Sequence, residues 1–468
     1  MQTTLEKRTY FTRDGAFYRT LFRLMLVVAL QNVVAYSVNV ADNLMLGSYS
    51  QAALSGAATV NQIQFLLQQG IGCISNAMVM LCAQYWGRKE MSPIRRLTGV
   101  TLKVGVLVGT CLFALTALLP RQILLLFTSD AEILDAGVEY LSILKYTYML
   151  YILTTILLAA LRSVETVRIA FTVSAMSLVV NVGINYTLIF GRFGFPELGV
   201  RGAAIGTLVA RTLELAVVLL YVLKIDRKLR LFSENFLRRD RQLARDYRRV
   251  ALPVTATGML WAVATPIQTG ILGHLSSDAI AANSVATTMF QYLKVITMSQ
   301  ASSSSVVVGK MVGEGKNTKP RLQPYVRALQ AIFLVLGFAL GGVLLAIRGP
   351  ILSLYALTPS AMSLADQLLI LMAVIFVGMA YQMPASMGIV QGGGDTKFNM
   401  FMNLISVWGI VMPLSFAAAF WWKLPVVWVV LCLNSDQLFK CLPVGLYANS
   451  YRWIHVLTRN TAPDGAEK

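Results

Sequence analysis

A single carboxylate, Asp42, stands near the end of a long apolar stretch, Val28–Gly47 (VALQNVVAYSVNVADNLMLG). The stretch is long enough to cross a bilayer as a helix, and it also carries the amides Gln31, Asn32 and Asn39. A carboxylate at membrane depth is costly, so it usually faces a protein interior or an aqueous cavity and binds or relays a cation. The alternative is that Asp42 lies among the lipid headgroups, where a charge costs little. Position alone leaves both interpretations open.

Other charged side chains also fall inside apolar segments. Glu214 follows Arg211 by three residues, and Lys440 follows Asp436 by four, so each pair can meet on one helix face. We expect both pairs to be structural, with contact to a transported compound as the alternative for Glu214. Lys294 has no acidic residue within a helical turn, so its ammonium should face an aqueous cavity or a carboxylate of another helix. In a cavity, it would suit anionic or zwitterionic compounds better than cations.

Composition limits the class of protein. Of 468 residues, 56% are hydrophobic and 13% are charged, and the mean hydropathy is +0.63. A soluble chain of this length cannot bury so much apolar surface, so the sequence predicts an all-α polytopic membrane protein. The net charge of +18 comes from Lys and Arg clustered between apolar segments. This is the pattern of cytoplasmic loops, so we expect a lipid bilayer and no nucleic acid as the partner.

The residues of common catalytic sites are not arranged for catalysis. Five cysteines lie inside apolar segments and lack the paired spacing of a disulfide or a metal site: Cys73, Cys82, Cys111, Cys432 and Cys441. The two histidines, His274 and His455, lie near segment ends, and no nucleophile or phosphate-binding motif is found. We therefore expect no enzyme and no bound cofactor.

About twelve membrane-spanning helices are predicted from the apolar segments. We expect them near residues 18–47, 52–84, 94–119, 132–162, 167–191, 199–226, 249–272, 279–309, 324–347, 361–391, 397–421 and 425–451. Turns on one side carry several basic residues, among them Arg88, Arg95 and Arg96, whereas the first turn on the other side (GSYSQ) has none. This asymmetry places both chain termini in the cytoplasm.

One basic segment, Lys228–Arg249 (KLRLFSENFLRRDRQLARDYRR), interrupts the pattern. Its leucines and phenylalanines recur at helical spacing among arginines, so we expect an amphipathic helix on the inner leaflet, with a solvated linker as the alternative. The predicted organisation is a cytoplasmic segment 1–17, an N-lobe 18–227, this linker 228–248, a C-lobe 249–453 and a cytoplasmic tail 454–468.

The two predicted lobes are related by an internal repeat. LGSYSQAALSGA from Leu46 matches LGHLSSDAIAAN from Leu272, and the same shift of 226 residues aligns Gly87 with Gly313. Because six helices separate the copies, both enter the membrane from the same side. Transporters of that design bind their substrate between the lobes. The repeat therefore predicts two pseudo-symmetric six-helix lobes with the substrate bound between them.

Several segments together resemble the multidrug and toxic compound extrusion (MATE) family of prokaryotic antiporters. They are VADNLMLGSYSQAALSGA, AQYWGRKE, NVGINYTLIFGRFGFPELGVRGAAIGT, LPVTATGMLWAV, QGGGDT and WIHVLT, and the likeness runs from about residue 20 to 458. The resemblance implies that the two lobes surround a central cavity, and it implies secondary active export of organic, often cationic or amphipathic, drug-like compounds in exchange for inward Na⁺ or H⁺. It also implies a bacterial or archaeal plasma membrane, and we expect a monomer.

The resemblance also implies an ion site in the N-lobe. In this family an aspartate of the first helix is central to ion coupling, and Asp42 occupies that position. One branch adds an asparagine, an aspartate and a threonine, which correspond here to Asn181, Asn185 and Thr207. Asn181 and Asn185 project from one helix face, so both amides can point at Asp42. With one carboxylate where that branch has two, Na⁺ should bind weakly at these four residues, and coupling of H⁺ through Asp42 alone is equally open. The alternative is that the two asparagines only tie helices together.

Another branch couples ions through acidic residues deep in the C-lobe, and this chain departs from it. Thr257 and Gly258 stand where relatives often have a glutamate, and the tenth helix has only Asp366, near its start. We therefore assign the ion to the N-lobe. Side chains suited to line the substrate cavity are Lys294, Glu214, Tyr36, Trp261, Gln268 and Met289.

Two other functions are compatible with parts of this pattern. The first is a flippase for a lipid-linked saccharide or another anionic amphiphile, for which Lys294 is the best support. The second is a non-transporting scaffold or receptor, which gives no reason for the repeat or for Asp42. Export driven by an ion gradient would distinguish antiport from both.

Overall fold

The structure, a computed structural model, describes residues 10–232, 236, 240–273, 277–316, 318–353 and 358–458. Over these residues the chain is almost entirely helical, and its only β-type pairing is an isolated antiparallel bridge between Gly394 and Ile454. The predicted all-α fold is confirmed. His274 and residues 459–468 of the predicted tail lie outside the described residues.

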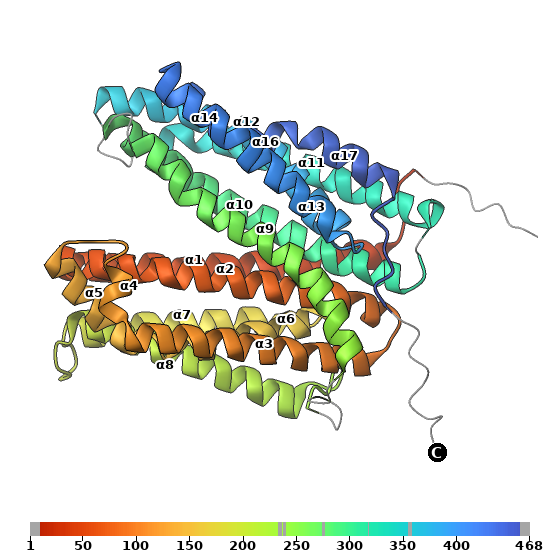
Figure 1. The fold of residues 1–468 in the computed structure, drawn as a ribbon, viewed down its shortest axis with the longest axis horizontal. Helices are drawn as coiled ribbons and strands as arrows, with labels where there is room; N and C mark the ends of the chain where they lie inside the picture. Colours follow the sequence, from red (N-terminus) through yellow and green to blue (C-terminus); the bar gives the residue numbers. More distant parts are fainter. Residues whose placement is uncertain are drawn as a thin grey trace, which may run out of the picture. The chain divides into compact units, whose positions relative to one another are not determined.

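One compact unit, which we call the N-lobe, comprises Leu26–Cys82 and Glu90–Met259. Its helices are most of α1 (Gly15–Tyr49) and α2 (Gln51–Gly87), then α3 (Met91–Leu118), α4 (Pro120–Leu124), α5 (Ala131–Leu144), α6 (Thr147–Ser163), α7 (Arg168–Ile189), α8 (Gly199–Leu220), the π-helical η1 (Tyr221–Ile225) and the first half of α9 (Arg241–Gly273). In Figure 1, α7 and α8 run side by side, and α6 packs against both α3 and α8. The N-lobe is thus a bundle whose apolar faces cover one another.

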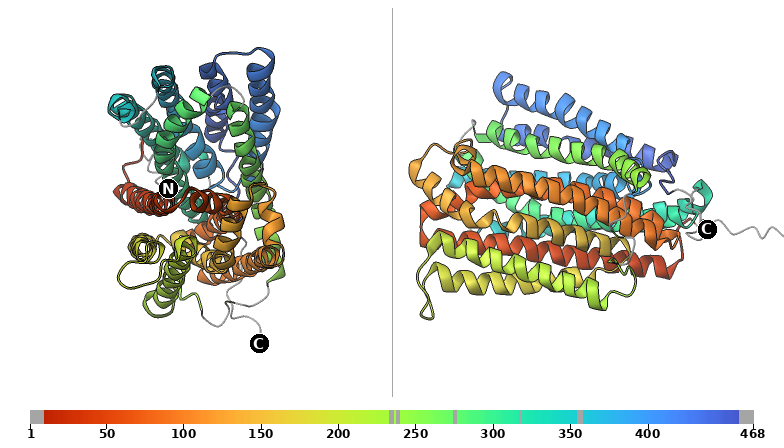
Figure 2. Two further views of the ribbon diagram at one scale, coloured as in Figure 1. Left: turned by 90° about the vertical axis from the view of Figure 1, so that its left-hand side faces the viewer. Right: turned by 60° about the horizontal axis from the view of Figure 1, so that its bottom comes forward.

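The other compact unit, the C-lobe, comprises Met1–Met25, Ala83–Lys89 and Leu260–Lys468. Its helices are the second half of α9, α10 (Ser277–Gly313), α11 (Lys319–Leu352), α12 (Pro359–Met383), η2 (Pro384–Val390), α13 (Thr396–Asn403), η3 (Leu404–Val411), α14 (Met412–Phe416), η4 (Ala417–Trp421), α15 (Val426–Leu433), α16 (Asp436–Phe439) and α17 (Cys441–Ser450). Figure 2 shows these helices, coloured green to blue, as a bundle in which α12 packs against α10 and α11. Buried side chains of α10, α11, α12 and α15 form its apolar core, including Ala286, Leu344, Leu368 and Val430.

All twelve predicted spans correspond to helices. Among the described residues, eight helices are long and apolar enough to span a membrane alone, and two bent pairs can do so together. The remaining two predicted spans are α8 and α10, helices of 22 and 37 residues that fall outside this group. The twelve-helix, two-lobe architecture is therefore confirmed.

Helix breaks are the part of the fold that hydropathy does not predict. The fourth span bends by 53° between α5 and α6, and the twelfth bends by 43° between α15 and α16. At the second bend the side chains of Asn434 and Ser435 donate to the carbonyls of Val430 and Cys432, at 3.0 and 2.8 Å. Polar side chains that bond the preceding turn compete with the backbone ladder and bend helices.

The predicted amphipathic helix over the basic segment is wrong in its first part. Residues 226–232 are irregular, because Asp226 accepts hydrogen bonds from the backbone amides of residues 228–230 and Arg230 has a φ of 44°. Helix α9 begins only at Arg241, where the side chain of Asp240 accepts two backbone hydrogen bonds. Short acidic side chains that bond nearby amides favour turns and caps over continuous helix. Residues 233–235 and 237–239 lie outside the described residues.

The compact units divide the chain differently from the predicted lobe limits of 18–227 and 249–453. The first half of α9 belongs to the N-lobe, and the hydroxyl of Tyr247 donates to the carbonyl of Ile74 at 3.1 Å. The end of α2 belongs to the C-lobe, and the amide of Gln84 donates to the carbonyl of His455 at 3.1 Å. Hydropathy predicts where a span begins and ends. It does not predict with which compact unit the end of the span packs, which depends on polar contacts such as these.

The glycines that the repeat aligns, Gly87 and Gly313, lie at one close crossing of α2 and α10. A Cβ on Gly87 would meet the backbone carbonyl of Lys310, and a Cβ on Gly313 would meet the backbone of Gln84. Neither backbone can move aside as the end of a side chain can. Glycine at both positions is therefore required by the packing.

We expect Gly313→Ala to lower the free energy of unfolding by about 1–3 kcal/mol, because overpacking a close contact strains the backbone. A matched control is Gly342→Ala in α11, where nothing lies within 4 Å of the added carbon. That change should be neutral or stabilising, since alanine favours helix over glycine by up to about 1 kcal/mol. Thermal unfolding of the two purified variants measures both. Equal melting temperatures would contradict the close crossing.

Candidate functional site

The N-lobe brings the four predicted ion-site residues into one hydrogen-bonded chain. The amide of Asn185 donates to Oδ1 of Asp42 at 2.5 Å and to Oδ1 of Asn181 at 3.2 Å. The amide of Asn181 in turn donates to the hydroxyl of Thr207 at 3.4 Å. The chain links α1, α7 and α8. Its role as an ion site stays a prediction.

Local sequence explains how α7 reaches both neighbours. Asn181 and Asn185 lie one turn apart, and both are almost fully buried, at 1% and 0% exposure. Helix α8 approaches them closely because it has glycine at 206, where a Cβ would collide with Oδ1 of Asn185. Thr207 follows at once, and its hydroxyl donates to the carbonyl of Ala203 at 3.1 Å. The GAAIGT segment thus lets α8 pack directly onto the asparagine face of α7.

Asp42 itself lies seven residues before the end of α1, which is about two helical turns inside the helix. Its side chain is half-buried and faces the N-lobe through its bond with Asn185. Oδ1 of Asn185, by contrast, is buried and accepts no hydrogen bond from the described residues. An unpartnered buried acceptor costs about 1–3 kcal/mol.

A positive charge stands next to this chain. Arg211, one turn after Thr207 on α8, pairs with Glu214 at 2.8 Å and lies 5.1 Å from the ring centroid of Tyr151. Its guanidinium also interacts electrostatically with Asp42. Glu214 is 5% exposed, so its carboxylate serves Arg211. The spacing predicted this pair, but it gave no sign that Arg211 also acts on Asp42.

Sequence reasoning missed Tyr140 in α5. Its side chain is 3% exposed, forms a hydrogen bond with Thr207 and interacts electrostatically with Asp42. One tyrosine in an apolar span of a chain with 18 tyrosines carries no signal of its own. Only the fold brings α5 against α8 and so adds this hydroxyl to the chain.

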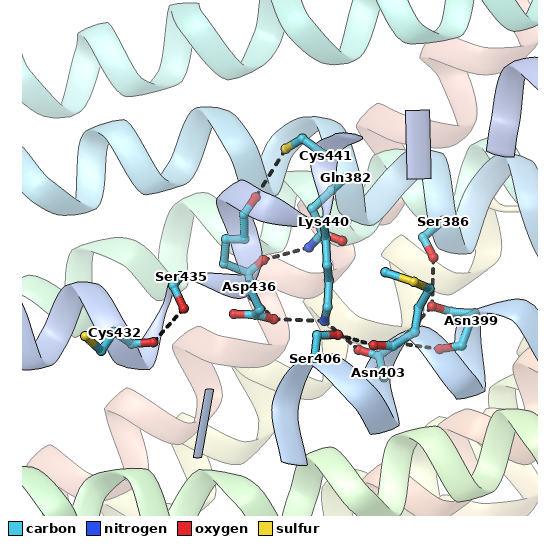
Figure 3. A network of polar contacts seen from close by, with 12 residues as sticks. Gln382, Ser386, Asn399, Asn403, Ser406, Cys432, Ser435, Asp436, Lys440 and Cys441 are labelled. Carbon is cyan, nitrogen blue, oxygen red and sulfur yellow. Dashed lines mark hydrogen bonds and ion pairs between the residues drawn. The ribbon is translucent and has the colours of Figure 1, made fainter. Parts of the chain in front are cut away.

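The C-lobe holds a second polar network, shown in Figure 3, around the predicted Asp436–Lys440 pair. The ammonium of Lys440 donates to Oδ2 of Asp436 and to Oδ1 of Asn403, both at 2.9 Å. Asp436 and Lys440 are 6% and 4% exposed. Lys294 of α10 interacts electrostatically with the same Asp436 and lies 4.3 Å from the ring centroid of Trp261. Among the described residues Lys294 forms no ion pair, so which of its two expected environments it occupies stays a prediction.

The remaining cavity candidates are dispersed. Tyr36 is 41% exposed on α1, Gln268 is half-buried in α9, and Met289 packs against the apolar core of the C-lobe. Thr257 of α9 is buried and its hydroxyl donates to the carbonyl of Pro253 at 2.8 Å. Asp366 pairs with Arg348 at 2.9 Å. Among the described residues, no three His, Cys, Asp or Glu side chains converge as ligands of a metal.

The family model MatE matches residues 28–187 and 253–417, which is more than half of the chain. The probable multidrug resistance protein NorM of Thermotoga maritima is 23% identical over 445 residues, 94% of each chain. The probable multidrug resistance protein YoeA of Bacillus subtilis is 24% identical over 419 residues, 87% of this chain and 88% of that one.

Solved structures show the same fold. A MOP superfamily transporter from Pyrococcus furiosus is 15% identical, with a TM-score of 0.83 over 96% of this chain and all of that chain (100%). The eukaryotic MATE transporter AtDTX14 is 18% identical, with a TM-score of 0.81 over 94% of this chain and 97% of that one. With the family model matched across both lobes and the twelve-helix fold shared, the chain belongs to the MatE family of membrane efflux transporters, which are not enzymes.

Proposed function

We propose that this protein is a secondary active antiporter that exports organic, amphipathic compounds in exchange for inward cations, with Asp42 as the group that takes up the cation. The observation that carries the proposal is the buried chain from Asp42 through Asn185 and Asn181 to Thr207. The bacterial relatives named as multidrug resistance proteins support a drug-like cargo. We further propose a monomer in a bacterial or archaeal plasma membrane, with both termini in the cytoplasm.

Charge on Asp42 holds α1 against α7 and α8. The ionised carboxylate accepts a charge-assisted hydrogen bond from Asn185 and is attracted by Arg211. Hydrogen bonds to charged groups contribute about 1.5–3 kcal/mol, so neutralising Asp42 removes a substantial part of this attachment. Uptake of a cation would then release α1, and that rearrangement is the step that we couple to release of the cargo.

Between the two candidate ions, the surroundings of Asp42 favour the proton. Na⁺ requires several oxygen ligands, and Asp42, Asn181, Thr207 and the unpartnered Oδ1 of Asn185 are the oxygens at hand. In the observed arrangement Asn185 turns an N–H to the carboxylate and its oxygen away. Its amide must rotate before it can bind Na⁺, and the nearby guanidinium of Arg211 repels a second cation. A proton needs only the carboxylate.

The alternative is a flippase that moves a lipid-linked saccharide or another anionic amphiphile. The one observation in its favour is the ammonium of Lys294 beside Trp261, which can bind an anionic group. A flippase of that kind would move its substrate without an ion gradient. The two functions therefore separate in a vesicle assay.

We expect export of a fluorescent dye from proteoliposomes to follow an imposed proton gradient and to fall to the background rate in Asp42→Asn. A membrane potential adds about 2.3 kcal/mol per charge per 100 mV to the driving force. The variant should still bind the dye, which is the control for folding. Export driven by a sodium gradient alone would show that the coupling ion is Na⁺ and not the proton. Undiminished export by Asp42→Asn, or dependence on ATP, would overturn the proposal.

Gly206→Ala tests whether the amide of Asn185 must sit against Asp42. The added carbon would collide with Oδ1 of Asn185 and displace the amide. Loss of a hydrogen bond to a charged group should slow gradient-driven export about tenfold or more. Gly183→Ala on α7 is the matched control, since nothing lies within 4 Å of its added carbon. Equal export by the two variants would show that the bond does not take part in coupling.

A further inference from the structure

Three charged side chains of the C-lobe, Lys294, Asp436 and Lys440, form a cluster with one more positive than negative charge. Lys440 and Asp436 are an ion pair at 2.9 Å. Among the described acidic residues, Asp436 is the one that acts electrostatically on Lys294, and the two are not within ion-pair distance. An unbalanced charge at membrane depth is costly, so it needs a counter-charge from elsewhere.

Asp436 cannot serve as that counter-charge without leaving its present partners. Its Oδ2 accepts from Lys440 at 2.9 Å, as Figure 3 shows, and from the side-chain amide of Gln437 at 3.0 Å. Gln437 in turn accepts from the amide of Gln382 on α12 at 2.7 Å. The carboxylate is therefore neutralised and fixed on the side of Lys440.

The partners of Lys440 are fixed as well. Asn403, which accepts from Lys440, donates to Oδ1 of Asn399 at 2.8 Å, and the hydroxyl of Ser386 donates to the same oxygen at 2.7 Å. These bonds connect the twelfth span to α13 and η2 (Figure 3). A network so connected resists rearrangement, because moving one member leaves others unsatisfied. The positive charge in excess is thus that of Lys294.

Lys294 is also the least buried member of the cluster. Asp436 and Lys440 are 6% and 4% exposed, whereas Lys294 and Trp261 are only half-buried. The ammonium lies over the indole ring, 4.3 Å from its centroid, which orients it by a cation–π interaction. A positive charge beside an aromatic plane suits a ligand with an acidic group on an apolar, aromatic body. It repels a ligand whose only charge is positive.

We propose that Lys294 and Trp261 form the C-lobe binding position for an acidic group of the cargo, so that the exported compounds are anionic or zwitterionic amphiphiles. This inference rests on the proposed export function and narrows its substrate class away from the simple organic cations expected by resemblance. The cargo's acid supplies the counter-charge that the cluster lacks.

A matched pair of dyes tests the inference. Rhodamine 110 carries a free carboxyl group, and rhodamine 123 is its methyl ester, so the two differ in that charge on one aromatic body. We expect the purified wild-type protein to bind rhodamine 110 more tightly, measured by fluorescence polarisation. In Lys294→Met the affinity for rhodamine 110 should fall about tenfold or more, since a charge-assisted bond is lost, and that for rhodamine 123 should not fall.

Two further variants complete the design. Lys294→Arg keeps the charge and should restore the preference for rhodamine 110, so a folding defect is separated from loss of charge. Lys397→Met removes an exposed lysine of the same lobe, and should leave the preference unchanged. Equal binding of the two dyes by the wild type, or an unchanged preference in Lys294→Met, would overturn the inference.

Binding and transport separate this inference from the proposed function. Asp42→Asn should lose gradient-driven export of both dyes and keep the preference for the carboxyl form in binding. A wild type that binds rhodamine 110 preferentially but exports neither dye under any ion gradient would overturn antiport and leave the binding position standing. A wild type that exports both dyes equally under a gradient, without preference in binding, would overturn the binding position and leave antiport standing.

Discussion

A carboxylate held inside a membrane-spanning helix needs hydrogen-bond donors, and much of the N-lobe is arranged to supply them. Asp42 lies about two turns within α1. Asn185 supplies the donor at 2.5 Å, and it can do so only because α7 is packed tightly enough to leave both asparagines almost fully buried. That packing depends on a glycine at 206 of α8, which lies against Asn185. Through Asn185, this glycine also affects the position of Asp42 and α1.

The two lobes carry opposite charge imbalances. Around Asp42 there are two carboxylates, Asp42 and Glu214, and one guanidinium, Arg211. Around Asp436 there are two ammonium groups and one carboxylate. In each lobe one internal pair is neutral and one charge is left over: a carboxylate in the N-lobe and an ammonium in the C-lobe. A cation bound at Asp42 and an anion bound at Lys294 would neutralise these two charges, and this is the physical basis for the proposed binding of an ion and a cargo in separate lobes of one chain.

The sequence predicts what depends on local pattern and misses what depends on distant packing. Apolar run length determines the spans, so all twelve correspond to helices, and the Arg211–Glu214 and Asp436–Lys440 pairs follow from helical spacing. Asp436, which interacts electrostatically with Lys294, lies 142 residues further along the chain, and only the fold brings the two together. The same holds for Tyr140. The predicted start of the helix at Lys228 was wrong because of a local effect. Apolar spacing favours a helix there, but Asp226 and Asp240 accept hydrogen bonds from nearby backbone amides.

Asn181 and Thr207 illustrate a third case. Neither spacing nor composition assigned them a role, and only resemblance to a family placed them beside Asp42. In the structure Asn181 donates to Thr207 at 3.4 Å and accepts from Asn185 at 3.2 Å, and Asn185 also donates to Asp42. What resemblance could not supply is the direction of each bond. In the structure Asn185 presents an N–H to the carboxylate, while its Oδ1 lies against Gly206.

Both bent spans lie beside these charge clusters. In the N-lobe the bend between α5 and α6 is flanked by Tyr140, which contacts Thr207, and by Tyr151, which lies under Arg211. In the C-lobe the bend between α15 and α16 comes directly before Asp436. Interrupted helices in transporters line binding sites, because freed backbone groups are tolerated there and the helix can pivot. A change of charge at either cluster would act on a bent span, and this supports the proposed conversion of proton or cargo binding into movement of a helix.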